Sequence, residues 1–375
     1  MSSSAAPAAR ATRRTRIVCI SDTHNTTVKL PKGDVLIHAG DLTNQGSYSE
    51  LSKTVQWLEK ADFEAKIVIA GNHDITLDPL FYSKHGASFH NQNLQDPAKC
   101  LSLLTSSPSI TYLQHSSATI RLTRPDGPGT QFTVFGSPYS PQYRTWAFMY
   151  RRHPPRAGSS HLSPSPDEEP STRPAPAELW AGIPLATDIL VTHTPPRGHC
   201  DDAYGCDDLR AALARVRPRL HVCGHVHQGR GATRVRWDAD GVGGGGRAGD
   251  GEGGGEGEKG EDDNDDEAAV EASAQPWLDP HPDPASAKIS LVDLTARRGN
   301  EPLNFEEDSV LPEEGDEQAG VDAGGVKQQR GHRTRRGRRE TCVVNPAIVA
   351  TGWPHRGGKR FNKPIVVDID LPVWR

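Results

Sequence analysis

The chain reads Lys-Ile-Val-Ile-Ala-Gly-Asn-His-Asp at residues 66–74, a short apolar run followed by a glycine and three polar side chains. The run Ile67–Ala70 is rich in β-branched residues, which is typical of a strand buried on both faces of a parallel sheet. Open α/β sheets carry their chemistry beyond the carboxyl ends of their strands. Asn72, His73 and Asp74 therefore form a candidate site at one strand exit. An Asx turn after a strand would look similar, so the motif matters because it recurs.

Four more predicted strands end in side chains of the same kind. Tyr48–Ala61, between two of these strands, has apolar residues at helical spacing and predicts β-α-β order with parallel pairing. His38 lies inside a strand rather than after it, and we interpret it as a core histidine. The strands and their exits are Arg16–Ser21 with Asp22 and His24, Asp34–Ala39 with Asp41, Asp188–Thr192 with His193, and Leu220–Cys223 with His225 and His227.

The remaining apolar runs predict an α/β protein. A second helix is expected at 207–215. Further strands are expected at 118–122, 132–135, 288–294, 341–344 and 364–370.

Composition predicts one domain with long inserts. A length of 375 residues could hold two domains, but only 34% of the residues are hydrophobic, and 37 are glycine and 30 proline. The apolar residues are concentrated, so we expect a disordered leader at 1–15 and a single domain over 16–375. Disordered inserts are predicted at 151–178, 239–286 and 296–340, which are Pro/Ser-rich, Gly/acidic or poor in apolar residues.

Cysteine usage bears on the cellular compartment. The six cysteines form no CxxC pair, and Cys19 and Cys223 lie inside apolar runs, which favours reduced core thiols in a cytoplasmic protein. The leader is rich in Ser, Ala and Arg, so mitochondrial import is the alternative, although the leader is short. No apolar run approaches the ~20 residues that a membrane span needs. The net charge of −5 says little about partners.

The residues at the five strand exits suit a pair of metal ions. They comprise two carboxylates, four imidazoles and one amide oxygen, a donor set for two divalent transition metals about 3.5 Å apart with one bridging carboxylate. Two M²⁺ ions against two carboxylates leave roughly +2, or +1 with a bridging hydroxide, which suits an anionic phosphate ester. None of these seven donors is a thiolate, which disfavours a closed structural zinc site. The seven residues are Asp22, His24, Asp41, Asn72, His193, His225 and His227.

The order of these motifs carries a resemblance. Asp-x-His, Gly-Asp, Gly-Asn-His-Asp, a lone His after a strand and Gly-His-x-His together resemble the calcineurin-like metallophosphoesterase superfamily. Within it, residues 192–201, 224–233 and 341–371 resemble small metallophosphoesterase-domain proteins related to animal cyclic-nucleotide phosphodiesterases. The resemblance covers about 16–150, 180–238 and 341–371. It implies a four-layer α/β/β/α sandwich of two mixed sheets.

The resemblance also implies roles for the exit residues. A hydroxide that bridges the two metals would attack phosphorus in line, with His73 as general acid and Asp74 as the carboxylate that orients His73. Mn²⁺ is the favoured ion, with iron and zinc as alternatives. Some animal members have glycine in place of the last histidine; because His227 is present here, we expect two competent metal sites. Metal 1 would be bound by Asp22, His24, Asp41 and His227, and metal 2 by Asp41, Asn72, His193 and His225, with Asp41 as the bridge.

Substrate contacts are less well defined by the sequence. Arg197 and His199 follow a predicted ligand loop and could hold a phosphate oxygen, although a solvated loop is the favoured interpretation. Trp146 and Phe148 are interpreted as loop packing, with a substrate shelf as the alternative. The resemblance implies a small phosphate ester as substrate, with phosphodiesters, including cyclic nucleotides, ahead of phosphomonoesters. Fold alone does not decide between them.

Two other classes of function are alternatives to a phosphohydrolase. A non-catalytic scaffold would usually have lost a ligand or the general acid, and Asn72, His73 and His227 are all present. A nuclease could use the arginine cluster at 330–339 to bind backbone phosphates, but a solvated loop offset by the acidic run is favoured for this cluster. The sequence leaves the oligomeric state open.

Overall fold

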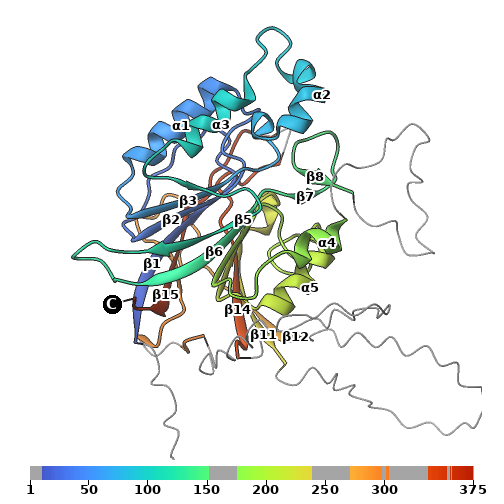
Figure 1. The fold of residues 1–375 in the computed structure, drawn as a ribbon. Helices are drawn as coiled ribbons and strands as arrows, with labels where there is room; N and C mark the ends of the chain where they lie inside the picture. The colour runs from blue at the N-terminus through green and yellow to red at the C-terminus, as the bar shows by residue number, and fades with distance from the viewer. Residues whose placement is uncertain are drawn as a thin grey trace, which may run out of the picture.

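The computed structural model describes residues 11–151, 175–238, 271–297, 301–303, 337–352, 355 and 357–374. These residues form two mixed β-sheets flanked by helices (Figure 1). The first sheet has the order β13 (Ser290–Asp293), β15 (Ile365–Pro372), β1 (Thr12–Ile20), β2 (Val35–Ala39), β3 (Ala65–Ile69) and β4 (Thr111–Tyr112). The second has the order β12 (Glu271–Trp277), β11 (Gly231–Trp237), β14 (Glu340–Asn345), β10 (Leu220–Val222), β9 (Ile189–Thr192), β6 (Gln131–Ser137) and β5 (Ser116–Arg121).

Parallel pairing brings the strand exits together in each sheet. In the first sheet β1, β2, β3 and β4 are parallel, and β15 runs antiparallel to β1. In the second, β6, β9, β10 and β14 are parallel, and β11 runs antiparallel to β14. The short strands β7 (Ser140–Pro141) and β8 (Met149–Tyr150) pair with each other beside the second sheet. The carboxyl ends of the parallel strands thus share one edge in each sheet.

Helices cover the outer face of each sheet (Figure 1). On the first sheet lie α1 (Tyr48–Lys60), α2 (Pro79–Phe89) and α3 (Pro97–Thr105), and on the second lie α4 (Pro176–Ala181) and α5 (Asp207–Val216). Helix α1 begins at a capping box, in which the Ser47 side chain accepts from the Glu50 amide and the Glu50 carboxylate accepts from the Ser47 amide. The structure also has 3₁₀ turns at Ile75–Leu77, after the end of β3, and at His227–Gly229, after the end of β10.

The alternation of side chains along each strand produces the layers. On β1, Ile17 and Cys19 face the second sheet, where they pack with residues such as Val191 of β9. Val18, on the other face of β1, packs instead with residues of α1, including Leu51. A third cluster lies between the second sheet and its own helices. The structure is therefore the four-layer α/β/β/α sandwich that the sequence predicted.

Most predicted elements occur within a few residues of their expected bounds, and the exceptions have physical reasons. Strand β1 begins at Thr12, inside the predicted leader, because its exposed first residues pair with β15 through the backbone. Strand β12 lies inside the predicted insert 239–286, where it pairs with β11 although its side chains are mostly exposed. Backbone ladders of this kind need no apolar pattern. Helix α4 likewise begins inside the insert predicted at 151–178.

Several predictions fall partly outside the described residues. Residues 152–174, 239–270, 298–300 and 304–336 of the three inserts lie there, and the last of these ranges contains residues 330–336 of the arginine cluster. Within the described part, Arg338 is buried and pairs with the Asp188 carboxylate and the Thr187 carbonyl, so it is not a solvated residue. All six cysteines are free. None of the described helices has the length and apolar character of a membrane span. The assignment of 16–375 to one domain stays a prediction.

Candidate metal centre

The seven predicted ligands converge where the carboxyl ends of the two sheets meet. Asp22 and His24 follow β1, Asp41 follows β2 and Asn72 follows β3, whereas the remaining histidines follow β9 and β10 of the second sheet. The residues from the first sheet are buried, and His225 and His227 are half-buried. Among the described residues, overlapping groups with ligand atoms mutually within 4.8 Å are Asp22–His24–His227, Asp41–His193–His225 and His24–Asp41–His73.

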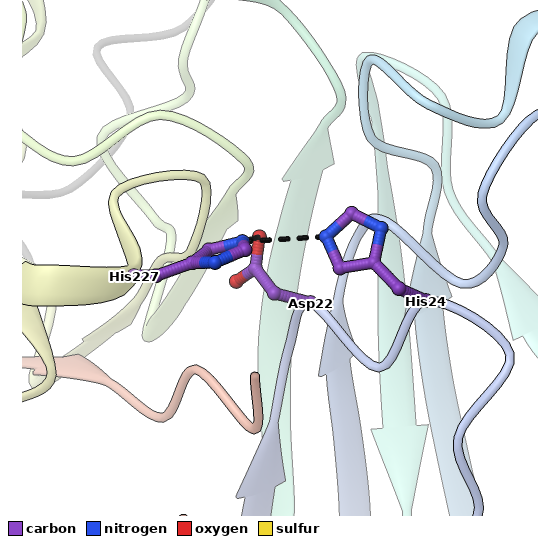
Figure 2. A group of neighbouring side chains, drawn as sticks. All are labelled: Asp22, His24 and His227. Carbon is purple, nitrogen blue, oxygen red and sulfur yellow. Dashed lines mark hydrogen bonds and ion pairs between the residues drawn. The ribbon is translucent and has the colours of Figure 1, made fainter. Parts of the chain in front are cut away.

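The first group joins both sheets through three side chains (Figure 2). His227 reaches across from the second sheet, and its Nε2 lies 3.4 Å from Oδ1 of Asp22 and 3.3 Å from Nε2 of His24. Asp22 also accepts the His225 backbone amide at 3.0 and 3.1 Å, which ties the loop after β10 to the exit of β1.

The second group is centred on Asp41 and Asn72. His193 Nε2 lies 3.3 Å from Oδ2 of Asp41 and 3.1 Å from Oδ1 of Asn72. His225 approaches the same Asn72 oxygen with its Nδ1 at 2.7 Å. Asp41 Oδ2 is also 3.6 Å from His24 Nε2, so this carboxylate lies between the two groups.

Backbone carbonyls hold the outer nitrogen of three of the rings. Nδ1 of His24 lies 3.2 Å from the Thr43 oxygen, Nδ1 of His193 lies 2.9 Å from the Ala39 oxygen, and Nδ1 of His227 lies 3.3 Å from the Thr351 oxygen. A carbonyl only accepts, so each Nδ1 carries a proton, and Nε2 is the nitrogen that each ring turns toward the centre. This arrangement is the usual outer support of metal-binding histidines.

The donor set fits divalent cations. Two ring nitrogens, Nε2 of His24 and of His227, face each other at 3.3 Å next to the Asp22 carboxylate. Such a contact is repulsive unless a proton or a metal ion lies between the donors. Imidazole, carboxylate and amide oxygen together suit manganese, iron or zinc better than calcium.

The charges of the carboxylates and imidazoles at this centre shift one another's pKa values. Burial alone would raise the pKa of Asp22, but the hydrogen bond and charge of His227 outweigh it and lower the pKa to about 2. Burial would lower the pKa of His193, but attraction by Asp41 raises it to about 9. Burial dominates for His24 and His225 and lowers each pKa to about 3. Metal binding must therefore displace a proton from His193.

The exit residues occupy strained backbone conformations. Asp22, His24, Asp41 and His225 have φ angles of 51°, 44°, 54° and 67°. Residues other than glycine rarely adopt this left-handed backbone conformation, and those that do cluster at functional sites. The glycine of the Gly-Asn-His-Asp motif permits close approach, because a Cβ on Gly71 would overlap the amide and carboxylate of Asp41.

His73 lies at the open side of the centre. Its backbone amide donates to Oδ1 of Asp41 at 2.8 Å, and its Nδ1 lies 2.8 Å from the carbonyl oxygen of Asn44. The ring meets the His24 ring edge-on at 4.8 Å and stacks on Trp146, with centroids 3.9 Å apart and planes at 34°. Because Nδ1 is bonded to a carbonyl, Nε2 is the nitrogen available to a bound molecule.

The prediction that Asp74 orients His73 is wrong. The Asp74 carboxylate is fully buried and accepts from the amides of Leu42, Thr43 and Gly71 and from the Thr43 hydroxyl, at 2.7 to 3.1 Å. It therefore fastens the exit of β2 to the exit of β3, and the Asn44 carbonyl orients His73 instead. Burial and the nearby charge of Asp41 raise the pKa of Asp74 to about 7.

Arg197 and His199 are held by protein groups. Arg197 bonds to the Ala203 carbonyl and lies 3.5 Å from the Asp207 carboxylate. His199 is only 2% exposed, and its Nε2 lies 3.0 Å from Glu271 of β12. A phosphate contact by His199 would require this pair to open, and the favoured alternative of a solvated loop is also wrong for His199.

Sequence reasoning missed residues that support the site from a distance. Thr351 holds His227 through its carbonyl. The Asn345 amide donates to the carbonyls of Cys200 and Val226 at 3.0 and 2.9 Å, joining two site loops. No local motif identifies these residues, because each acts on chain more than a hundred residues away. The stack of Trp146 on His73 also has no signal in the sequence, because it depends on how two loops pack together.

A two-sheet α/β sandwich that gathers carboxylates and histidines at its strand exits is a metallophosphoesterase-type fold. The profile of the family described as calcineurin-like phosphoesterase matches residues 15–229, more than half of the chain. The chain belongs to this family. Asn345 and Thr351 lie outside the matched region.

Three known proteins illustrate the similarity. "Probable rhamnogalacturonate lyase C" of Emericella nidulans is 42% identical over 226 residues, which are 60% of this chain and 18% of that protein. Human "Metallophosphoesterase domain-containing protein 1" is 37% identical over 233 residues, 58% of this chain and 62% of the relative. The structure of yellow lupin purple acid phosphatase PPD1 matches with a TM-score of 0.31 and 13% identity, covering 62% of this chain and 40% of that one. The match thus spans less than two thirds of either curated relative.

Proposed function

We propose that this chain is a dimetal phosphodiester hydrolase. One observation carries the proposal: donor atoms from both sheets face a common centre, while carbonyls hold the outer nitrogens of three of the histidines. The family membership supports phosphoester chemistry. The choice of a diester, with cyclic nucleotides as the diesters to test next and phosphomonoesters as the alternative, rests on the resemblance in residues 192–201, 224–233 and 341–371.

The grouping of the side chains suggests how two ions would be shared. Asp41 would bridge, because it lies between His24 of one group and His193 of the other. When bound, the two ions would supply Lewis acidity and lower the pKa of the attacking water, and Mn²⁺ is the ion to test first. The first ion would be held by Asp22, His24, Asp41 and His227, and the second by Asp41, Asn72, His193 and His225.

The chain's own groups would perform the remaining steps. His73 would donate a proton from Nε2 to the leaving oxygen, because its Nδ1 is committed to the Asn44 carbonyl. The bond between the His73 amide and Asp41 would keep that ring in register with the metal centre. Asp74 would act only by holding the two exits together.

The experiment is hydrolysis of bis-p-nitrophenyl phosphate and p-nitrophenyl phosphate with Mn²⁺ by the wild type, Asp41→Asn and His73→Ala. We expect turnover of the diester that collapses in Asp41→Asn. The loss in His73→Ala should be much smaller, because p-nitrophenolate is a weakly basic leaving group. Turnover of the monoester alone would indicate a phosphatase. Two bound ions per chain without turnover of either ester would favour a scaffold, and one tightly bound ion per chain would contradict the two-ion site.

The compartment is also a proposal. The six cysteines are free, and five of them are buried, which supports a reducing, cytoplasmic environment. Fractionation of the native host cell would test this placement, and enrichment in mitochondria would favour the alternative.

A further inference from the structure

We propose that Trp146 is a positioning residue that holds His73 at the angle needed to protonate the leaving group. This inference rests on the role proposed above for His73. Its geometric basis is the stack: the two ring centroids are 3.9 Å apart at 34°, closer than the other aromatic contacts of Trp146 and His73. Phe89 lies against the same indole at 5.3 Å and 47°, so Trp146 is itself supported.

The loop that carries Trp146 is anchored on both sides. The amide of Ala147 donates to the Asn72 carbonyl at 3.3 Å, directly before His73, and the amide of Phe148 donates to the Asp78 carboxylate at 2.8 Å. At the base of the loop, Ser140 and Gln142 donate to the carbonyls of Phe148 and Tyr150. The indole therefore has a fixed position relative to the turn that carries His73.

One residue of this loop indicates that the conformation is imposed by its surroundings. Phe148 is fully buried and has a φ of 56°, a region that costs a bulky residue on the order of 1–3 kcal/mol. A backbone of this kind persists only where contacts enforce it. Here those contacts place Trp146 over His73.

Three contacts then restrict the His73 ring. The Asn44 carbonyl fixes Nδ1, the His24 ring meets the imidazole at 88°, and the Trp146 face packs on it at 34°. Without the indole the ring could turn away from the centre while its backbone stayed in place. A displacement of about 1 Å can cost as much as a hundredfold in rate.

The chemistry predicts a distinctive signature. A leaving group that is a weak base departs without a proton, whereas a strongly basic one needs the acid. Loss of Trp146 should therefore slow the ester with the more basic leaving group far more than the other. A defect in folding or metal binding would slow both esters equally.

The test compares methyl p-nitrophenyl phosphate with methyl phenyl phosphate. In Trp146→Ala we expect kcat to fall about tenfold or more for the phenyl ester but less than about threefold for the p-nitrophenyl ester, with KM little changed. Trp146→Phe keeps an aromatic face and should recover most of the loss. Tyr143→Ala removes an exposed aromatic from the same loop and should behave like the wild type.

A second readout is independent of activity. In metal-free protein, the ring current of the indole should shift the imidazole protons of His73 upfield in the NMR spectrum; their signals are assigned by their loss in His73→Gln. The shift should vanish in Trp146→Ala and persist in Trp146→Phe. If Trp146→Ala fails to fold, Trp146→Leu replaces it, because leucine keeps the packing on Phe89 without offering a flat face.

Each outcome is decisive. Equal losses on the two esters, or no loss in Trp146→Ala, would overturn the positioning role while the proposed function stands. An unshifted His73 signal in the wild type would overturn it as well. Absence of diester hydrolysis in the wild type would instead remove the proposed function, and this inference with it.

Discussion

Histidines inside the strands and histidines just beyond them have opposite hydrogen-bonding patterns. Within the strands, His38 Nε2 lies 2.9 Å from the Thr23 hydroxyl, and His221 Nε2 lies 2.7 Å from the Thr192 hydroxyl. Each hydroxyl also lies within hydrogen-bond distance of a carbonyl to which it can donate, so Nε2 carries the histidine proton. The Nδ1 atoms are buried and lack a hydrogen-bond partner in the part of the chain that the structure describes.

Beyond the strands the assignment of nitrogens is reversed. His24, His193 and His227 bond a carbonyl through Nδ1 and present Nε2 to the centre. A histidine inside a strand therefore uses Nε2 in a structural hydrogen bond, whereas a histidine beyond the strand end has Nε2 directed to the metal centre. In the strands a neutral threonine hydroxyl faces Nε2, and beyond the strands a carboxylate faces it. The position of the histidine relative to the end of the strand determines which of the two it meets.

The largest expected effect comes from making the same change at both kinds of position. His225→Gln removes a donor from the centre and should lower kcat for bis-p-nitrophenyl phosphate by about a thousandfold, the equivalent of several kcal/mol of lost Lewis-acid stabilisation. His221→Gln, four residues earlier, keeps a hydrogen-bond donor for Thr192 and should retain most of the activity. Steady-state kinetics with Mn²⁺ measure both variants.

The result for His221→Gln is the critical one. Equal losses in the two variants would remove the distinction between strand and exit histidines. Circular dichroism must first show that each variant is folded.

The second-largest expected difference between strand and exit histidines is in the stabilisation of the protein by Mn²⁺. Mn²⁺ at a hundredfold excess over its Kd should stabilise the wild type by about 2.7 kcal/mol per site, because it binds only the folded chain. His221→Gln should gain as much, and His225→Gln markedly less. Unfolding in urea with Mn²⁺ or with EDTA provides the measurement, and equal stabilisation of all three proteins would place the ions elsewhere.

The sequence predicted the five strands that carry the site, and the seven exit residues, because both follow from short-range patterns. An apolar run that stops at a polar side chain marks a strand end, and parallel pairing brings such ends to one edge. The four-layer fold was predicted for the same reason, together with the family resemblance. Alternation along β1 then determined which side chains formed each core.

Long-range contacts account for the errors. Asp74 follows His73 directly, yet its carboxylate bonds the exit of β2 because the turn directs it inward. His199 meets Glu271, which is 72 residues further along the chain and belongs to a strand with no apolar pattern. Positive φ angles aim side chains in directions that a hydrophobic pattern does not encode.

The hydroxyl partners of the strand histidines should contribute to stability rather than to turnover. Thr192→Val leaves the Nε2 proton of His221 buried without its acceptor and should cost about 1–3 kcal/mol of unfolding free energy at pH 7. Thr187→Val is the control, since the Thr187 hydroxyl bonds only the nearby Pro184 carbonyl among described groups and should cost about 1 kcal/mol. A Thr192→Val protein as stable as the control would show that the hydroxyl is dispensable to His221.

The smallest expected effect is on the pH dependence of the free energy of unfolding, which tests whether the strand histidine His221 stays neutral in the folded chain. Burial lowers the pKa of His221 to about 3, against about 6.5 in the unfolded chain. Above pH 6.5 the ring is neutral in both states and contributes no slope. As the pH falls below 6.5, His221 takes up a proton in the unfolded chain but stays neutral in the folded chain. The free energy of unfolding therefore declines by about 1.4 kcal/mol per pH unit until the pKa of the folded chain is reached.

The variant His221→Gln cannot take up this proton. Its urea midpoints in EDTA should therefore fall less steeply than those of the wild type between pH 6 and 4.5, and the two curves should be parallel between pH 7 and 8. Parallel curves in the acid range would mean that His221 is protonated in the folded chain. The strand histidines would then no longer differ in protonation from an exit histidine such as His193, whose pKa Asp41 raises to about 9.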